Sequence, residues 1–125
     1  IRAFANIGSD PALMLTGPVD VTEKLLKRSG FKLKDIDLFE LNEAFAAVVL
    51  RYMQAFDIDH NKMNVAGGAI ALGHPLAASG VRLMIQLAAQ FAERPDVRYG
   101  LTAMCVGLGQ GGSVIWENPH YNGKK

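Results

Sequence analysis

The sequence predicts an α/β domain in which helices cover a mixed, mostly parallel sheet. Short apolar segments of strand length alternate with segments whose apolar residues recur at helical spacing, which favours right-handed crossovers between parallel strands. A short glycine-rich connection joins the last two strand segments, so we expect the final strand to be antiparallel and to lie at an edge. The predicted order is β-α-β-α-β-α-β-β, forming one domain over residues 1–118 with a polar tail at 119–125.

The first strand and helix are bounded by turn residues. Residues 1–8 are mostly apolar and compatible with a strand, and a Ser-Asp-Pro turn follows them. The next segment has Pro18 in a first helical turn, where its missing N–H is tolerated, and Gly30 where a helix would stop. We therefore expect a helix that begins at Pro18 and ends before Gly30.

The second strand passes straight into the second helix. Residues 35–41, DIDLFEL, form the strand. Asn42 lies at the junction, where it suits the N-cap, and Glu43 suits the positive end of the helix dipole. The helix carries an apolar stripe that we assign to the core: Phe45, Val48, Val49, Tyr52, Met53 and Phe56.

The second half of the chain supplies three more strands. Residues 63–65 are a short candidate strand that leads into a glycine-rich loop. A helix over residues 77–93 covers the sheet, and its apolar face is formed by Val81, Met84, Ile85, Ala88, Phe91 and Ala92. Residues 99–106 read as a buried strand, and residues 112–117 return as the final strand.

Composition restricts the class of protein. The chain has 125 residues, half of them apolar, which suffices for one compact domain. A formal net charge of +1 argues against nucleic-acid binding, and no apolar run reaches the ~20 residues that cross a bilayer. Because no signal-peptide pattern is present, we expect an intracellular protein, in the cytoplasm or in an organelle. The chain begins at Ile1 inside a predicted strand, which suggests a piece of a longer protein.

A histidine lies on the glycine-rich loop ahead of the third helix. Gly67, Gly68 and Gly73 permit backbone angles closed to other residues and let a ligand approach the main chain. Pro75 biases His74 away from the helical region, so His74 should sit just ahead of a helix N-terminus, where the dipole favours a neutral ring. Either this ring takes part in chemistry, or it is a loop histidine that makes only a hydrogen bond.

Three polar or reactive residues lie at junctions between elements. Asn42 follows the second strand, His74 precedes a helix, and Cys105 comes just before the turn VGLGQGG. In sheets built from crossovers, strand ends and adjoining loops form the binding site. Cys105 is the single cysteine, so it is either a small buried hydrophobe or a reactive thiol. The three residues form a candidate constellation.

Four segments together resemble the C-terminal half of the thiolases: GPV at 17–19, DIDLFELNEAFA at 35–46, GGAIALGHP at 67–75 and CVGLGQGG at 105–112. The resemblance covers nearly the whole chain. It implies a thiolase-like fold and a CoA-dependent acyltransferase that cleaves 3-oxoacyl-CoA with a second CoA, or runs the reverse Claisen condensation. It also implies coenzyme A as a substrate, no permanently bound cofactor and no metal, an N-terminal thiolase half as partner, and a homo-oligomer.

The resemblance implies roles for four residues. His74 matches the histidine that activates the nucleophile and helps bind a thioester oxyanion, and Asn42 matches the residue that holds an ordered water there. Cys105 matches the second cysteine of thiolases, an acid and base toward the substrate α-carbon or the incoming CoA thiol. Gly107 matches the backbone N–H donor of the other oxyanion hole. The nucleophilic cysteine lies in the N-terminal half and has no counterpart in this chain.

Two positions depart from the family pattern. Many thiolases have glycine where this chain has Ala77 and Leu108. A branched side chain beside the Gly107 amide is expected to narrow or reshape the acyl pocket, so we place Leu108 on the substrate-binding side, together with Phe45 of the NEAFA segment. Three interpretations stay open: a catalytic thiolase half, a thiolase-like module that binds acyl-CoA or lipid without turnover, and a structural half that supplies dimer or domain contacts.

Overall fold

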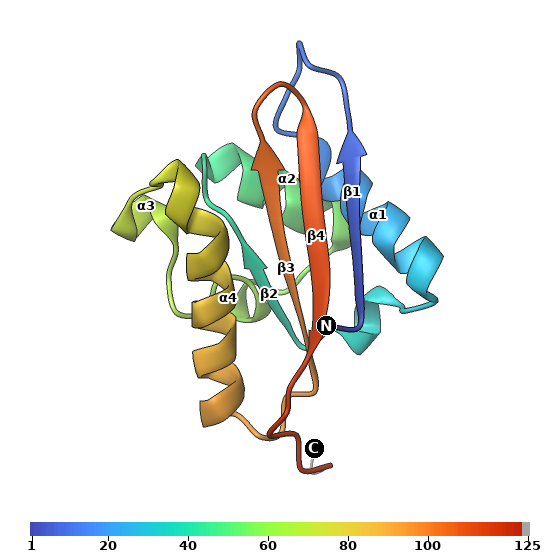
Figure 1. The fold of residues 1–125 in the computed structure, drawn as a ribbon, viewed down its shortest axis with the longest axis vertical. Coiled ribbons are helices and arrows are strands. Elements are labelled where there is room, and N and C mark those ends of the chain that lie inside the picture. The colour runs from blue at the N-terminus through green and yellow to red at the C-terminus, as the bar shows by residue number, and fades with distance from the viewer. Residues whose placement is uncertain (124–125) are drawn as a thin grey trace.

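The chain folds into a four-stranded sheet with helices on both faces, described for residues 1–123 by a computed structural model (Figure 1). The strands are β1 (Ala3–Gly8), β2 (Leu38–Leu41), β3 (Tyr99–Val106) and β4 (Gln110–Glu117). The helices are α1 (Gly17–Ser29), α2 (Ala46–Phe56), α3 (Ala69–Leu72) and α4 (Leu76–Glu93), with short 3-10 turns η1 (Leu33–Asp35) and η2 (His60–Lys62). None of the helices in residues 1–123 is long and apolar enough to cross a membrane.

The strand order is β1-β4-β3-β2, with β2 parallel to β3 and the other pairs antiparallel. The register sets Ala3 opposite Ile115 and Thr102 opposite Val114. The α/β class and the antiparallel last strand are confirmed. The predictions of a mostly parallel sheet and of a last strand at the edge are wrong, because β1 pairs with β4, which therefore lies inside the sheet. Pairing between strands so far apart in sequence leaves no periodic signal that could have revealed it.

The expected third strand is reduced to one parallel bridge between Phe39 and Met63. Asn64 ends it, because its φ of 47° is incompatible with an extended chain. Its backbone N–H still donates to Phe39 O at 2.8 Å. Its side-chain amide makes two hydrogen bonds to the backbone of Leu41. Oδ1 accepts from the Leu41 N–H at 2.8 Å, and Nδ2 donates to the Leu41 carbonyl at 2.9 Å. A side chain thus replaces the missing strand along the edge of β2.

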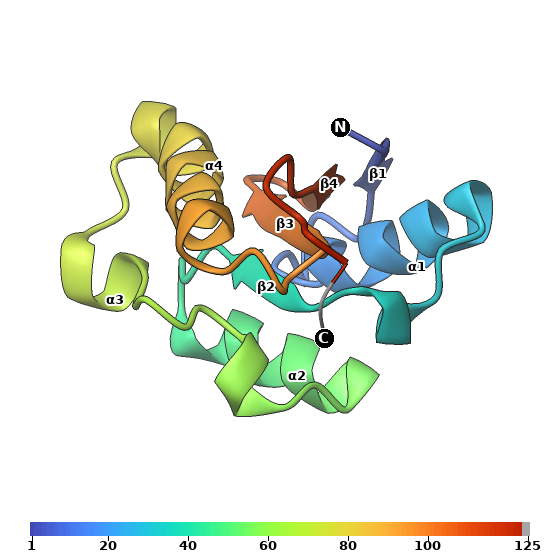
Figure 2. The same ribbon diagram turned by 90° about the horizontal axis from the view of Figure 1, so that it is seen from below.

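The helices form a layer on each side of the sheet (Figure 2). α1 and α2 cover one face, where Leu25 and Tyr52 pack with Phe39 and Leu41 of β2. α4 covers part of the other face, where Leu87 and Phe91 pack with Leu38. Because successive strand residues face opposite sides, every residue of β2 is buried. β2 is therefore covered by helices on both faces, although it is an edge strand of the sheet.

α2 begins three residues later than its sequence suggests. Phe45 is its N-cap, and Asn42 is not, because the Asn42 N–H continues the sheet by donating to Ala103 O at 3.0 Å. Val48 and Tyr52 are buried as predicted. Phe45 is 60% exposed and is not part of the core, since its extended backbone precedes the first turn.

The apolar face predicted for α4 is mostly its outward face. Val81, Met84 and Ile85 are exposed, whereas the inward side chains are Ser79, Leu83, Leu87, Gln90 and Phe91. α4 carries two apolar rows, and periodicity alone does not say which row meets the sheet. An apolar groove of about 250 Å³ runs beside α4 and is lined by residues that include Phe4, Met84 and Trp116.

A carboxyl group is buried between β2 and α4. Glu40 is 1% exposed and accepts a hydrogen bond from Gln90 Nε2 at 2.5 Å. Within residues 1–123 the second carboxyl oxygen of Glu40 has no hydrogen-bond partner. Burial raises the pKa of Glu40 to about 7, outweighing the Gln90 hydrogen bond and the Arg82 charge, which lower it.

Replacing Glu40 by glutamine is expected to stabilise the fold at alkaline pH. The pKa of Glu40 is higher in the folded than in the unfolded chain. The contribution of Glu40 to the free energy of unfolding is therefore fully present below pH 4.5 and is lost as the pH rises through about 7. Glu40→Gln should therefore raise the free energy of unfolding by about 2–3 kcal/mol at pH 8 and leave it nearly unchanged at pH 4. Urea unfolding at both pH values measures this, with the exposed Glu23→Gln as control. An equal difference at both pH values would contradict it.

Candidate functional site

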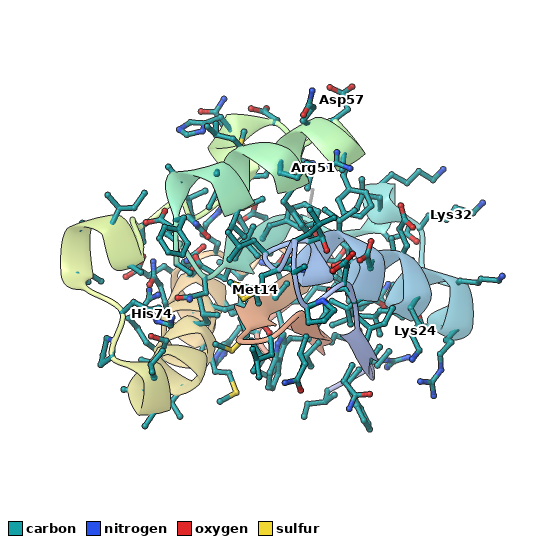
Figure 3. All side chains as sticks on the ribbon, turned by 90° about the horizontal axis from the view of Figure 1, so that it is seen from above. Met14, Lys24, Lys32, Arg51, Asp57 and His74 are labelled. Atoms are coloured by element: carbon teal, nitrogen blue, oxygen red, sulfur yellow. The ribbon has the colours of Figure 1, made fainter. Side chains whose placement is uncertain are left out.

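The candidate site lies where β2 ends and the loop before α4 passes it. Asn42 directly follows β2, and His74 precedes α4 by two residues, as the sequence predicts. His74 is half-buried and lies beside α3 and α4, on the opposite side of the molecule from Lys24 and Lys32 (Figure 3). The packing of α4 against β2 therefore brings Asn42 and His74 together.

Ser79 decides which nitrogen of His74 carries the proton. The Ser79 hydroxyl donates to the Pro75 carbonyl at 3.1 Å and lies 2.6 Å from His74 Nδ1. With the single hydroxyl proton directed at Pro75 O, the Nδ1–H of His74 is the donor in the second bond. In this tautomer the lone pair of His74 is at Nε2, where it can accept a proton from an incoming thiol.

Asn42 lies over the His74 ring. Its Nδ2 is 3.4 Å from both ring nitrogens. A position in the ring plane at equal distance from both would collide with the carbon between them, so the amide nitrogen sits above the face. The in-plane direction of the Nε2 lone pair is thus left open by Asn42.

Glu43 fastens the glycine loop to the end of β2. Its carboxylate accepts hydrogen bonds from Ile70 N and Asn64 Nδ2, each at 2.9 Å. A Cβ on Gly68 would collide with this carboxylate, so a larger residue there would displace Glu43 from these hydrogen bonds. Glu43 lies before α2, and the end it stabilises is the start of α3, which the sequence did not indicate.

Cys105 lies at the same end of the sheet as Asn42, because β2 and β3 are parallel and Leu41 pairs with Ala103. Its half-buried side chain packs against the core on the α1 and α2 side. Among the described residues no hydrogen bond joins Cys105 to His74 or Asn42. Burial raises the pKa of the Cys105 thiol, so the protonated form prevails at neutral pH.

The turn after Cys105 is tightly constrained. Leu108 adopts a φ of 62°, which costs a branched residue roughly 1–2 kcal/mol, and its side chain is 75% exposed. Gly109 has a φ of 75°, and a Cβ there would lie 2.7 Å from the carbonyl oxygens of Ser9 and Asp10. Gly107 is exposed and has open space around it. Gly107 and Leu108 therefore face outward, as Phe45 does.

The sequence contains a signal for this site that periodicity of apolar residues does not detect. Ser79, Arg82, Gln86 and Gln90 recur every three or four residues along α4, which places four polar side chains on one helix face. That face meets Glu40 and Asn42. A polar stripe inside an otherwise apolar helix indicates a buried hydrogen-bond network.

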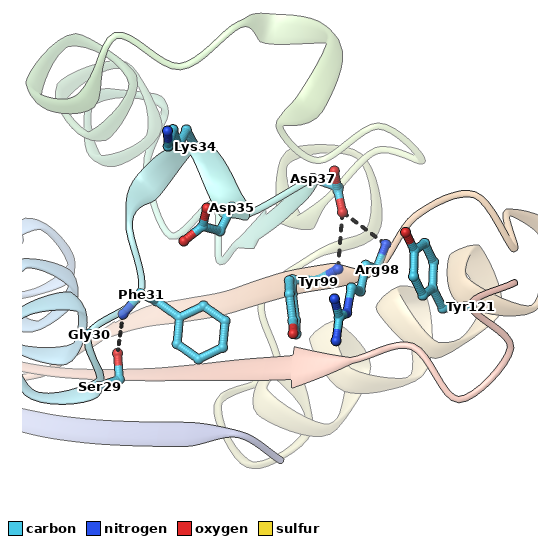
Figure 4. A pocket seen from close by; sticks show the side chains of 9 residues that line it. All are labelled: Ser29, Gly30, Phe31, Lys34, Asp35, Asp37, Arg98, Tyr99 and Tyr121. Carbon is cyan, nitrogen blue, oxygen red and sulfur yellow. Dashed lines mark hydrogen bonds between the residues drawn. The ribbon is translucent and has the colours of Figure 1, made fainter. Parts of the chain in front are cut away.

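A separate pocket of about 420 Å³ opens at the other end of the sheet (Figure 4). Asp37, just before β2, and Arg98, just before β3, contribute to its lining. The Asp37 carboxylate accepts from the N–H groups of Arg98 and Tyr99 at 2.8 and 3.1 Å. The pocket adjoins the starts of the two strands, whereas Asn42 and Cys105 lie at their ends. Residues 1–123 hold no cluster of three or more His, Cys, Asp or Glu side chains that could bind a metal ion.

Comparison with known proteins agrees with the resemblance. The family model for "Thiolase, C-terminal domain" matches residues 1–118. A 3-ketoacyl-CoA thiolase of Aliivibrio salmonicida is 50% identical over 122 residues, which are 95% of this chain and 31% of that protein.

Two solved structures are also similar. Human mitochondrial 3-ketoacyl-CoA thiolase superposes with a TM-score of 0.89 at 43% identity, over 94% of this chain and 30% of its own. A structure of the human enzyme in complex with CoA gives a TM-score of 0.88 at 43% identity, over 93% of this chain and 29% of its own. This chain thus spans less than a third of the length of these relatives. The match over residues 1–118 shows that it belongs to the thiolase family, as a C-terminal domain.

Proposed function

We propose that this chain is the C-terminal part of a thiolase, a CoA-dependent acyltransferase that cleaves 3-oxoacyl-CoA or runs the reverse condensation. The observation that carries the proposal is the arrangement at His74, whose Nδ1–H is held by Ser79 and whose Nε2 is free to accept a proton. The human relative crystallised with CoA supports coenzyme A as a substrate. The proposed domain is residues 1–118, followed by the tail at 119–125.

The proposed chemistry begins with proton transfer to His74. Its Nε2 takes the proton of a nucleophilic cysteine supplied by the rest of the protein, and the resulting thiolate attacks the acyl carbonyl. The developing oxyanion is bound by the protonated Nε2 and by a water held at Asn42. The acyl group thus becomes bonded to the nucleophilic sulfur, and the leaving group departs as a carbanion or as the CoA thiolate.

The second step uses Cys105. In thiolysis its thiol group protonates the departing α-carbon, and the thiolate then takes the proton of the incoming CoA thiol; in condensation the transfers run in reverse. Gly107 N–H is proposed as the donor to the second oxyanion. Phe45 and Leu108 are proposed to face the acyl chain, because both are exposed and lie near Asn42 and Gly107, respectively, in the chain.

Separating the chain from its missing part tests the function. The 125-residue chain alone is expected to show no thiolysis of acetoacetyl-CoA, because its one cysteine, Cys105, is assigned to proton transfer and no nucleophilic cysteine is left to carry the acyl group. Co-expression with the missing two-thirds should restore thiolysis, and the missing part alone should not support it. Loss of the absorbance of the acetoacetyl-CoA enolate measures both. Turnover by the lone chain would contradict the proposal, and CoA binding by the joined protein without turnover would favour the non-catalytic module.

The partner proposed for the outer face of α4 is the rest of the thiolase chain. We define this face as Leu76, Val81, Met84 and Ile85, all exposed, with Leu76 at 82%. A helix that is apolar on two sides normally lies between two layers, and exposed apolar patches mark contact surfaces. The missing two-thirds of the length of the relatives is the available second layer. Homo-oligomer formation by the complete protein is part of the same proposal.

The lone chain is therefore expected to self-associate at micromolar concentration. Val81→Gln together with Ile85→Gln should shift it toward the monomer, because the two changes remove apolar surface from the outer face of α4. Leu50→Gln, on the exposed side of α2, is the matched control and should leave association unchanged. Sedimentation velocity and binding of an apolar dye measure the effect. A monomeric wild-type chain that binds no dye would disprove this expectation.

A further inference from the structure

We infer that Arg82 is a positioning residue whose guanidinium holds the Asn42 carboxamide in the orientation that presents its NH2 group to His74. The inference rests on the proposed function, because it gives Arg82 a part in acyl transfer. Arg82 Nη2 donates to Asn42 Oδ1 at 3.2 Å. A guanidinium can only donate, so the amide oxygen must face Arg82 and the NH2 group must face the imidazole.

Arg82 is itself oriented by the loop that carries His74. Its Nη1 donates to Gln86 Oε1 at 3.0 Å, and Gln86 Nε2 donates to Gly67 O at 2.5 Å. Both ends of this series have one allowed direction, since the guanidinium only donates and the carbonyl only accepts. These hydrogen bonds therefore connect the glycine loop, through Gln86 and Arg82 of α4, to Asn42 at the end of β2. They fix the orientation of the Asn42 carboxamide.

Placing the guanidinium of Arg82 at this position has a desolvation cost, and apolar packing does not explain why the residue is charged. Its side chain is partly buried, and Nε has no hydrogen-bond partner within residues 1–123. The neighbouring inward positions Leu83 and Leu87 are apolar, so an apolar residue would suit the surface equally well. Glu40 lies in β2, two residues before Asn42, and its charge interacts with Arg82. The partly buried guanidinium is thus explained by the Glu40 carboxyl nearby and by the Asn42 amide that it orients.

Loss of Arg82 would free the amide to rotate. With the carbonyl oxygen turned inward, Asn42 would place an acceptor over the face of the His74 ring and would withdraw the donor from the place where negative charge develops. The effect should fall on kcat, because the interaction matters when the oxyanion forms and not when CoA binds. Arg82 touches neither the substrate nor the reacting sulfur in this mechanism and acts only through Asn42.

A double-mutant cycle in the full-length enzyme tests the inference. Arg82→Met, which keeps the aliphatic stem, is expected to lower kcat for thiolysis by roughly 10–100-fold with KM nearly unchanged. In an Asn42→Ala background the same substitution should lower kcat less than about twofold, because the group that it positions is gone. Arg82→Lys, which can still donate to Asn42, should recover part of the loss. Arg51→Met, on the exposed surface of α2 away from His74 (Figure 3), is the matched control.

A readout without activity follows the amide itself. Protons above an aromatic ring are shielded, so in enzyme labelled with ¹⁵N-asparagine the NH2 signal of Asn42, assigned by its loss in Asn42→Ala, should lie upfield. Arg82→Met should move it to the ordinary range, and Arg51→Met should not. An unchanged signal in Arg82→Met, or additive losses in the cycle, would overturn the inference. A wild-type enzyme without thiolysis would instead contradict the proposed function, while the NH2 signal would still report the orientation.

Discussion

Replacing His74 by alanine in the full-length enzyme is expected to stop formation of the acyl-enzyme. Two contributions disappear together: the base at Nε2, typically worth 10²–10⁴-fold, and an oxyanion donor, worth roughly 2.7–4 kcal/mol. The first half-reaction with acetyl-CoA should therefore slow by at least about 10³-fold. Trapping of labelled acetyl-enzyme after rapid quenching measures it directly.

His120→Ala is the matched control for this experiment. His120 is an exposed histidine of the tail, and its backbone N–H, not its ring, makes the hydrogen bond to Asn118 Oδ1. Acylation of this variant should equal that of the wild type. Equal acylation by His74→Ala would remove His74 from the proposed role and leave it as a loop histidine bonded to Ser79.

Replacing Cys105 by alanine is expected to separate the two half-reactions. The nucleophilic cysteine should still be acylated by acetyl-CoA, because His74, Ser79 and Asn42 are untouched. Condensation and thiolysis should fall by about 10²–10⁴-fold, since the acid and base for the second substrate are lost. The raised pKa of the Cys105 thiol is consistent with a group that begins as a proton donor. Acyl-enzyme trapping beside the steady-state rate distinguishes the two steps.

Cys105→Ser separates proton transfer from packing. Serine has nearly the same shape, so the half-buried site should remain filled, but a hydroxyl gives up its proton far less readily than a thiol. The serine variant should therefore lose condensation nearly as fully as the alanine variant while its thermal stability stays close to that of the wild type. Near-normal condensation by either variant would show that Cys105 is a packing residue with no part in proton transfer.

Local signals predicted the elements that depend on neighbouring residues. α1 ends as expected at Gly30, whose φ is 77° and whose N–H donates to Leu26 O at 3.0 Å. The β3–β4 hairpin was predicted from its short glycine-rich turn. The junction at Asn42 was misread, because sheet hydrogen bonding to Ala103 prevailed over the preference of asparagine for an N-cap.

The candidate site divides in the same way. The motifs marked Asn42, His74 and Cys105 by residue type and by their places at element ends, and the structure brings Asn42 and His74 into contact. Ser79 and Arg82 are not predicted by the sequence, because apolar periodicity does not mark a polar helix face and the direction of a hydrogen bond has no sequence periodicity.

The family, the α/β class, the ends of α1 and the residue types of the site can all be predicted from the sequence, since each depends on short-range chemistry of the chain. Only the tertiary structure decided that β1 pairs with β4, that Asn64 replaces a third strand, and that α4 turns its polar stripe toward β2. Those features depend on contacts between residues far apart in the chain, where several pairings satisfy the same local pattern. The tautomer of His74 and the orientation of Asn42 follow from such contacts. Ser79, which has a single proton to give, sets the tautomer of His74, and Arg82, which can only donate, sets the orientation of Asn42.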